Sequence, residues 1–135
     1  MSNRYYLDSS FILVVVKGRA HNIPLVAELL NSRPTLIASK LVELECLATA
    51  KAVNASSQSS GVEAFFARID EWVEINDSLL DQAITIAEST PGLKAADAIH
   101  LAASQTANAV FLCAEKPNNP PLRAKGVESL SVYRS

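Results

Sequence analysis

The chain alternates short apolar or β-prone runs with longer segments in which apolar residues recur at helical spacing. The short runs predict strands at residues 4–7, 35–38, 73–75, 109–113 and 129–133. The periodic segments predict helices at 11–16, 23–30, 40–53, 62–70, 77–88 and 94–106. Strands that alternate with helices are typical of an α/β fold, so we expect three layers, α/β/α, around a central parallel sheet of about five strands.

One segment is of low complexity, the serine-rich stretch 54–61 with the sequence NASSQSSG. We predict that it is a mobile loop between two helices and not a domain linker, because a further helix and strand follow it. The chain has 135 residues, of which 49% are hydrophobic and 19% are charged. This length and composition predict one folded domain over residues 1–135 and exclude a disordered protein.

Cysteine usage, hydropathy and net charge narrow the class of protein further. Cys46 and Cys113 lack the spacing of a zinc or thioredoxin motif, so we expect both to be reduced and buried in a cytoplasmic protein. The longest apolar run, 11–16, is far shorter than the roughly 20 residues that span a bilayer, so no membrane association is expected. The formal net charge of −2 gives no global sign of nucleic-acid binding, and a polyanion would have to meet a local basic patch.

The helix at 40–53 carries a carboxylate on its predicted inner face. At about 100° per residue, Glu45 falls within an apolar stripe, whereas Glu43 lies on the far side and is assigned to solvent. The stripe consists of Leu41, Leu44, Ala48 and Ala52. An inward carboxylate must be paired, protonated or bound to a cation, because burying it alone is costly. A salt bridge, or a place at the rim of the stripe, is the structural alternative for Glu45.

The helix at 94–106 is apolar almost all round and is therefore predicted to be buried. A narrow polar seam of Asp97, His100 and Ser104, within about 60° of one another, runs along it. Asp97 would also gain about 0.3 to 1 kcal/mol from the helix dipole. For His100 we expect a hydrogen-bonded core histidine.

Two further acids follow predicted strands. Asp8 ends the first strand, and Glu115 follows the strand at 109–113. Asp8 could simply cap the next helix, and Glu115 could be a solvated loop residue. Sites in parallel sheets, however, form at the carboxyl ends of strands, and the helices that carry Glu45 and Asp97 would flank the same edge. We therefore expect the four carboxylates to meet in one cleft.

Four carboxylates in one cleft repel one another and raise each other's pKa, so a positive group should lie among them. Oxygen ligands without pairs of His or Cys favour Mg²⁺ or Mn²⁺ over zinc or copper. Such ions bridge phosphate oxygens, polarise phosphorus and generate hydroxide at neutral pH. The four acids thus predict hydrolysis of a phosphodiester.

Four segments resemble the PIN-domain ribonucleases, particularly the small VapC-type toxins of bacterial toxin–antitoxin pairs. They are YLDSSFIL at 6–13, SKLVELE at 39–45, KAADAIHLAAS at 94–104 and FLCAEK at 111–116, of which the third is the most specific. The resemblance covers nearly the whole chain and implies a PIN-like α/β/α fold. It places the family's metal-binding acids on Asp8, Glu45, Asp97 and Glu115, and the hydroxyl beside the first acid on Ser9.

The resemblance implies a metal-dependent endoribonuclease that cleaves RNA with Mg²⁺ or Mn²⁺. It also implies the toxin of a type II pair, inhibited by a small cognate antitoxin and usually a homodimer. RNA affinity should come from a basic rim around the acidic cleft, although a solvated side chain is the simpler interpretation of each basic residue. The rim candidates are Lys17, Arg19, Lys40 and Lys94.

Two positions depart from the family's pattern. Glu115 stands where the family usually has Asp, and Cys113 stands where it usually has Thr or Ser. Glu carries its carboxylate roughly 1.5 Å farther than Asp, which is enough to disturb the octahedral shell of Mg²⁺. These departures leave a second metal site in question. They support an alternative function, a catalytically degenerate PIN-like domain that binds RNA or a partner protein without cleavage.

A response-regulator receiver is a rival class with the same sheet, because Lys116 and Pro117 follow a strand. A receiver needs paired acids after its first strand and an Asp after its third, whereas Asp8 stands alone and the next Asp is Asp70. The glycines at 18, 61, 92 and 126 form neither a dinucleotide motif nor a P-loop. The acids therefore favour the nuclease over both rivals.

Overall fold

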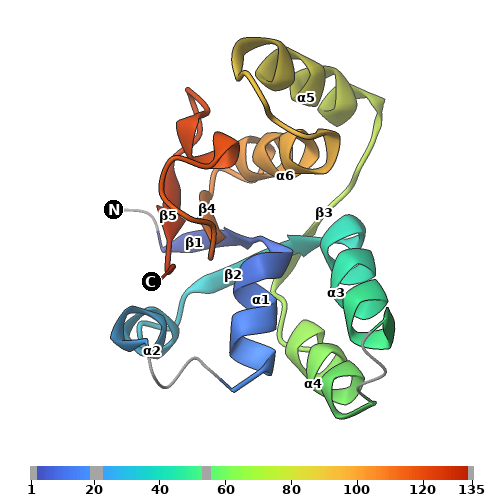
Figure 1. Cartoon of the computed structure of the whole chain (residues 1–135), viewed down its shortest axis with the longest axis vertical. Coiled ribbons are helices and arrows are strands. Elements are labelled where there is room, and N and C mark those ends of the chain that lie inside the picture. Colours follow the sequence, from blue (N-terminus) through green and yellow to red (C-terminus); the bar gives the residue numbers. More distant parts are fainter. Residues whose placement is uncertain (1–2, 19–22, 53–55, 134–135) are drawn as a thin grey trace.

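The computed structural model describes residues 3–18, 23–52 and 56–133 of the chain (Figure 1). A five-stranded sheet lies at its centre in the order β3-β2-β1-β4-β5, and every neighbouring pair of strands is parallel. The strands are β1 (Arg4–Leu7), β2 (Thr35–Ser39), β3 (Glu71–Val73), β4 (Val110–Cys113) and β5 (Ser129–Ser131). The predicted parallel sheet of about five strands is confirmed.

Helices cover both faces of this sheet and complete the three layers of an α/β/α fold (Figure 1). On one face α1 (Ser9–Val16), α3 (Lys40–Ala52) and α4 (Ser56–Phe66) pack against one another, with α2 (Pro24–Asn31) on the same side. On the other face α5 (Asp77–Ser89) packs against α6 (Ala95–Thr106). A short 3-10 helix, Pro120–Arg123, lies between β4 and β5.

The core lies on both sides of the three central strands. Because helices shield both faces, consecutive strand residues are buried, which is why these strands read as uniform apolar runs. The largest fully buried side chains include Tyr6, Leu7, Phe11, Ile12, Ile37, Leu101 and Phe111.

The order of the strands reverses at β1. The chain continues from β1 to β2 on one side, whereas β4 pairs with β1 on the other side. The N–H of Asp8 donates to the carbonyl of Leu112 at 2.9 Å, which extends the pairing just past the end of β1. The carboxyl ends of β1 and β4 therefore form the switch point at which open α/β sheets bind ligands.

The segment predicted as a serine-rich loop is mostly helical. α4 begins at Ser56, so residues 56–61 belong to a helix, while residues 54 and 55 lie outside the described part of the chain. A Cβ at Gly61 would lie only 3.0 Å from Cγ1 of Val16, so α4 approaches α1 closely there. Serine and glycine are weak helix formers, but tertiary packing against α1 and α3 outweighs that preference.

The predicted end of this helix is also corrected. α4 ends at Phe66 instead of residue 70, and β3 begins at Glu71 instead of residue 73. Asp70 explains the shift, because its carboxylate accepts a hydrogen bond from the N–H of Leu36 at 2.8 Å. This contact ties the end of the connecting segment to the start of β2, so the chain must already have left the helix.

Gly61→Ala tests the packing of α4 on α1. Alanine is normally favoured over glycine in a helix interior by about 1 kcal/mol. Here we expect no gain in the free energy of unfolding, because the added methyl group would press on Val16. In a Val16→Ala background the same change should raise the free energy of unfolding by about 1 kcal/mol. Urea denaturation of the four proteins measures both effects, and an equal gain in both backgrounds would contradict the close approach.

Candidate functional site

Asp8 lies at the carboxyl end of β1 with only 4% of its surface exposed. Its carboxylate accepts a hydrogen bond from the N–H of Ser10 at 3.2 Å and thereby caps α1. The hydroxyl of Ser10 donates to the same oxygen and accepts a hydrogen bond from the N–H of Ala114 at 2.9 Å. The N-cap interpretation of Asp8 is therefore correct. It does not compete with a functional role, because the cap fixes the carboxylate between the ends of β1 and β4.

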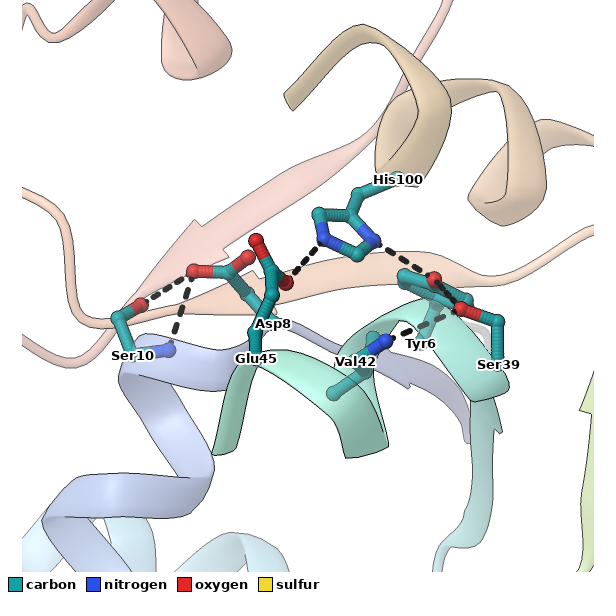
Figure 2. A network of polar contacts seen from close by, with 7 residues as sticks. All are labelled: Tyr6, Asp8, Ser10, Ser39, Val42, Glu45 and His100. Carbon is teal, nitrogen blue, oxygen red and sulfur yellow. Dashed lines mark hydrogen bonds and ion pairs between the residues drawn. The ribbon is translucent and has the colours of Figure 1, made fainter. Parts of the chain in front are cut away.

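The hydroxyl that touches Asp8 comes from Ser10, whereas the resemblance placed the relevant hydroxyl on Ser9. Both serines lie in the first turn of α1, and the helix directs Ser10 toward the carboxylate (Figure 2). A role for Ser9 stays a prediction. Ser10 is a functional candidate that the sequence left unassigned, although Asp-Ser-Ser before a helix is a recognisable capping signal.

Burial is the main electrostatic influence on Asp8. It raises the pKa of Asp8, and the nearby negative charge of Glu45 adds to the increase. The hydrogen bonds from Ser10 and the proximity of His100 oppose it. The folded chain therefore holds an acid that water solvates poorly, next to further acids.

The inner face of α3 is not the predicted one. Val42 and Cys46 are fully buried, whereas Leu44 is 63% exposed and Ala48 is also exposed. The predicted stripe is therefore wrong. α3 begins directly where β2 ends, so the strand sets its orientation, and its own apolar pattern does not decide which residues face the sheet.

Glu45 and Glu43 differ in their partners and not in their exposure. The Glu43 side chain, which we assigned to solvent, is 27% exposed and pairs with Lys40 at 3.0 Å, whereas that of Glu45 is 31% exposed. Oε1 of Glu45 lies 2.6 Å from Nε2 of His100, on the side where Asp8 lies (Figure 2). The structure thus brings Glu45 to the switch point and leaves Glu43 on the flank of α3.

His100 is fully buried on α6 and hydrogen bonded at both ring nitrogens. Its Nδ1 lies 2.8 Å from the hydroxyl of Tyr6, which in turn lies 2.8 Å from the hydroxyl of Ser39. The expectation of a hydrogen-bonded core histidine is confirmed, and Glu45, for which a salt bridge was the structural alternative, is paired with this histidine by a hydrogen bond. Ser104 in the same seam is also buried, and its hydroxyl donates to the carbonyl of Ala109 at 2.8 Å.

The pKa of Asp97 responds to burial and to the charges of the other three acids. Its pKa is raised to about 6, first because the carboxyl is partly buried and then because the negative charges of Asp8, Glu115 and Glu45 lie nearby. His100 opposes this increase. Charges act on one another over short distances in a partly buried site. Asp8, Glu45 and Glu115 thus lie near enough for their charges to act on the carboxyl of Asp97, at the edge where β1 and β4 end.

Glu115 follows β4 and is held by a neighbour in its own loop. Its Oε2 accepts a hydrogen bond from Nδ2 of Asn119 at 2.6 Å, and its carbonyl accepts one from the hydroxyl of Ser131. Glu115 is half-buried, so water can still reach the carboxylate that Asn119 holds.

Both cysteines are free and buried, as expected. Burial raises the pKa of Cys46 to about 12 and that of Cys113 to about 11. A thiol with such a pKa is protonated at neutral pH and is a poor nucleophile or metal ligand. Cys113, which stands where the family has a hydroxyl, therefore contributes a small apolar side chain.

The donor set fits a hard divalent cation in its chemistry. Asp8, Asp97, Glu45 and Glu115 offer carboxylate oxygens only, which are the ligands that hard divalent cations prefer. Within residues 3–18, 23–52 and 56–133, however, no three His, Cys, Asp or Glu side chains already form a metal cage. One oxygen of Glu45 is hydrogen bonded to His100 and one oxygen of Glu115 to Asn119, so these side chains would have to rotate for all four acids to share one ion.

Three of the four residues proposed for a basic rim lie within the described part of the chain. Lys40 begins α3, and its ammonium lies 4.4 Å from the ring centre of Trp72. Lys94 is exposed and immediately precedes α6. Lys17, in contrast, caps the end of α1 that is farthest from Asp8. Arg19 lies outside the described residues.

The chain belongs to the PIN domain family, because the family's model matches residues 5–115. No curated protein matches the sequence.

Three solved structures share this fold at 12–15% sequence identity. VapBC2 from Rickettsia felis, bound to a DNA fragment of its promoter, has a chain that matches with a TM-score of 0.76 at 12% identity, covering 95% of this chain and 98% of that one. DNA-bound VapBC from Salmonella typhimurium gives 0.75 at 15% identity, with 98% and 99% coverage. A toxin–antitoxin complex from Klebsiella pneumoniae gives 0.73 at 15% identity, with 97% and 99% coverage. These matches confirm the PIN-like fold over the full length of those chains.

Among residues 3–18, 23–52 and 56–133, no helix has the length and apolar character needed to cross a bilayer.

Asp97→Asn tests the crowding of charge at the site. The pKa of about 6 in the folded chain exceeds the ordinary value of 3.8, so Asp97 supports folding below about pH 4, and that support is lost as the pH rises through 6. We expect Asp97→Asn to raise the free energy of unfolding by about 1 kcal/mol at pH 7.5, less than the full shift because water screens a half-exposed carboxylate. At pH 4 the gain should vanish. Urea denaturation at both pH values measures this, with Glu43→Gln as the control for removing a carboxylate that pairs with Lys40 on the flank of α3.

Proposed function

We propose that this PIN domain is a VapC-type toxin, a metal-dependent endoribonuclease that hydrolyses RNA phosphodiester bonds and is inhibited by a small antitoxin protein. The observation that carries the proposal is the presence of carboxylates from four separate segments near one edge of the sheet, where burial, and then the negative charges of the other three acids, raise the pKa of Asp97 to about 6. Membership of the PIN family and the likeness to chains from VapBC complexes support it.

Each residue of the site has a part in this proposal. Asp8 and Asp97 would hold Mg²⁺ or Mn²⁺, with Glu45 and Glu115 completing the oxygen ligands. The cation would supply an activated water and polarise the phosphorus. Ser10 keeps the carboxylate of Asp8 in place through its two hydrogen bonds. Lys40 and Lys94 are the described basic residues that we expect to bind RNA phosphates near this edge.

A PIN domain that binds RNA without cleaving it is the second candidate. Two observations favour it, the hydrogen bond that holds Glu115 to Asn119 and the separation of the acidic side chains. A well-formed Mg²⁺ site needs near-ideal octahedral geometry, which a misplaced carboxylate would disturb. The two candidates differ in whether RNA is cut.

The first experiment incubates the purified protein with a mixture of structured and single-stranded RNAs. We expect cleavage in Mg²⁺ or Mn²⁺ and none in EDTA, because the carboxylates need a cation to act on a phosphodiester. Gel electrophoresis of end-labelled RNA measures the products. RNA that is bound in a filter assay but stays intact with both metals would favour the non-cleaving domain. Cleavage that persists unchanged in EDTA would sink the metal-dependent mechanism.

Substitution separates the site from its surroundings. Asp8→Asn should lower the cleavage rate at least about 100-fold, because even residues that only support metal ligands typically cost 10- to 100-fold. Asparagine can still cap α1, so the protein should stay folded. Glu43→Gln, which lies on the same side of the sheet but pairs with Lys40, should change the rate less than about twofold. Initial rates and thermal melts of the three proteins test this, and a damaging Glu43→Gln would place the site elsewhere.

A further inference from the structure

Four polar side chains are linked by successive hydrogen bonds, and the last of them is one of the proposed metal ligands. This row runs from Ser39 at the end of β2, through Tyr6 on β1 and His100 on α6, to Glu45 on α3 (Figure 2). Ser39, Tyr6 and His100 are each fully buried, so water cannot replace any of their hydrogen bonds. The polar side-chain atoms of these three residues must therefore find their hydrogen-bond partners within the protein.

The direction of these hydrogen bonds follows from the end at Ser39. The N–H of Val42 can only donate, and it points to Oγ of Ser39 at 3.4 Å. The proton of Ser39 is then free to go to the hydroxyl oxygen of Tyr6, and the proton of Tyr6 goes to Nδ1 of His100. In the opposite direction Ser39 would accept twice, and its own proton would have no acceptor among the described residues.

The contact between His100 and Glu45 independently indicates the same direction for these hydrogen bonds. An ionised carboxylate only accepts hydrogen bonds, so Nε2 of His100 must carry the proton in its 2.6 Å contact with Oε1 of Glu45. A neutral ring with its proton on Nε2 has a bare Nδ1, which is the acceptor that Tyr6 requires. One tautomer of His100 thus satisfies both ends of the row.

We propose that His100 is a positioning residue for Glu45, held in its Nε2-protonated tautomer by Tyr6 and Ser39. This inference rests on the proposed function for its metal-binding consequence. The row fixes one carboxylate oxygen of Glu45 against a rigid, buried ring and leaves the other oxygen for the cation. Hydrogen-bonded partners of ligating carboxylates set ligand orientation in this way. His100 does not touch the substrate, because its ring is enclosed.

Imidazole ¹⁵N chemical shifts read the tautomer directly and need neither metal nor activity. The chain has one other histidine, His21, so a His21→Gln variant assigns the signals of His100. At pH 7.5 we expect His100 to carry a proton on Nε2 and a bare Nδ1. A proton on Nδ1 would overturn the proposal, whether or not the protein proves to be a nuclease.

Metal affinity then tests the consequence. We expect His100→Leu to weaken Mn²⁺ binding, measured by calorimetry, by about 10- to 100-fold, the usual cost of losing a partner of a metal ligand. His100→Gln should stay within about threefold of the wild type, since its amide nitrogen is the same number of bonds from the backbone as Nε2 and can donate to Glu45. Tyr6→Phe, which removes only the hydroxyl that fixes the ring, should weaken binding in the same direction but less.

Ser104→Ala is the matched control. It removes a fully buried hydroxyl and one hydrogen bond from the same helix without touching the row. Its melting temperature should fall while its Mn²⁺ affinity stays unchanged. Equal Mn²⁺ affinity in wild type, His100→Leu and Tyr6→Phe would overturn the positioning role. Failure of the wild type to bind Mn²⁺ would instead overturn the proposed function. The imidazole ¹⁵N shifts would then still show whether His100 has the proposed tautomer.

Discussion

Repulsion between like charges governs the carboxyl edge of this sheet. The parallel arrangement brings the ends of β1 and β4 together, and the flanking helices add their own acids to the same place. Burial, and then these neighbouring negative charges, raise the pKa of Asp97 to about 6. Acids that are partly buried beside one another destabilise the folded chain, and this cost is the physical reason for assigning a cation to this edge in the proposed function.

The general fold could be predicted because it depends on local patterns. Uniform apolar runs identify strands that are covered on both faces, and their alternation with helices leads to a parallel sheet. The start of α4 could not be predicted in this way. Its serine-rich sequence favours a loop, and packing against α1 and α3, in which Gly61 approaches Val16 from 45 positions away, makes a helix the better choice.

The candidate acids could be proposed from the sequence, but the side chains that form hydrogen bonds with them could not be predicted. The choice of Glu45 over Glu43 was useful although the predicted stripe on α3 was wrong, because a strand directly before the helix sets its rotation. The contact between Glu45 and His100 joins positions 55 apart, and no periodicity within one helix indicates it. Tyr6 offered one signal, since a tyrosine in a buried strand needs a partner for its hydroxyl.

These partners divide the site into two halves of different rigidity. Asp8 is capped at a helix start and Glu45 is tied to a buried ring, so both carboxylates are anchored to regular elements of the core. The carboxylate of Glu115 is hydrogen bonded to Asn119 within the loop that follows β4, and its carbonyl to Ser131 of β5. Loops tolerate changes in side-chain length and backbone better than elements that pack on a core do. The replacement of the family's usual Asp by Glu therefore falls in the half where a longer side chain can be accommodated, and it leaves the arrangement of Asp8 and Glu45 intact.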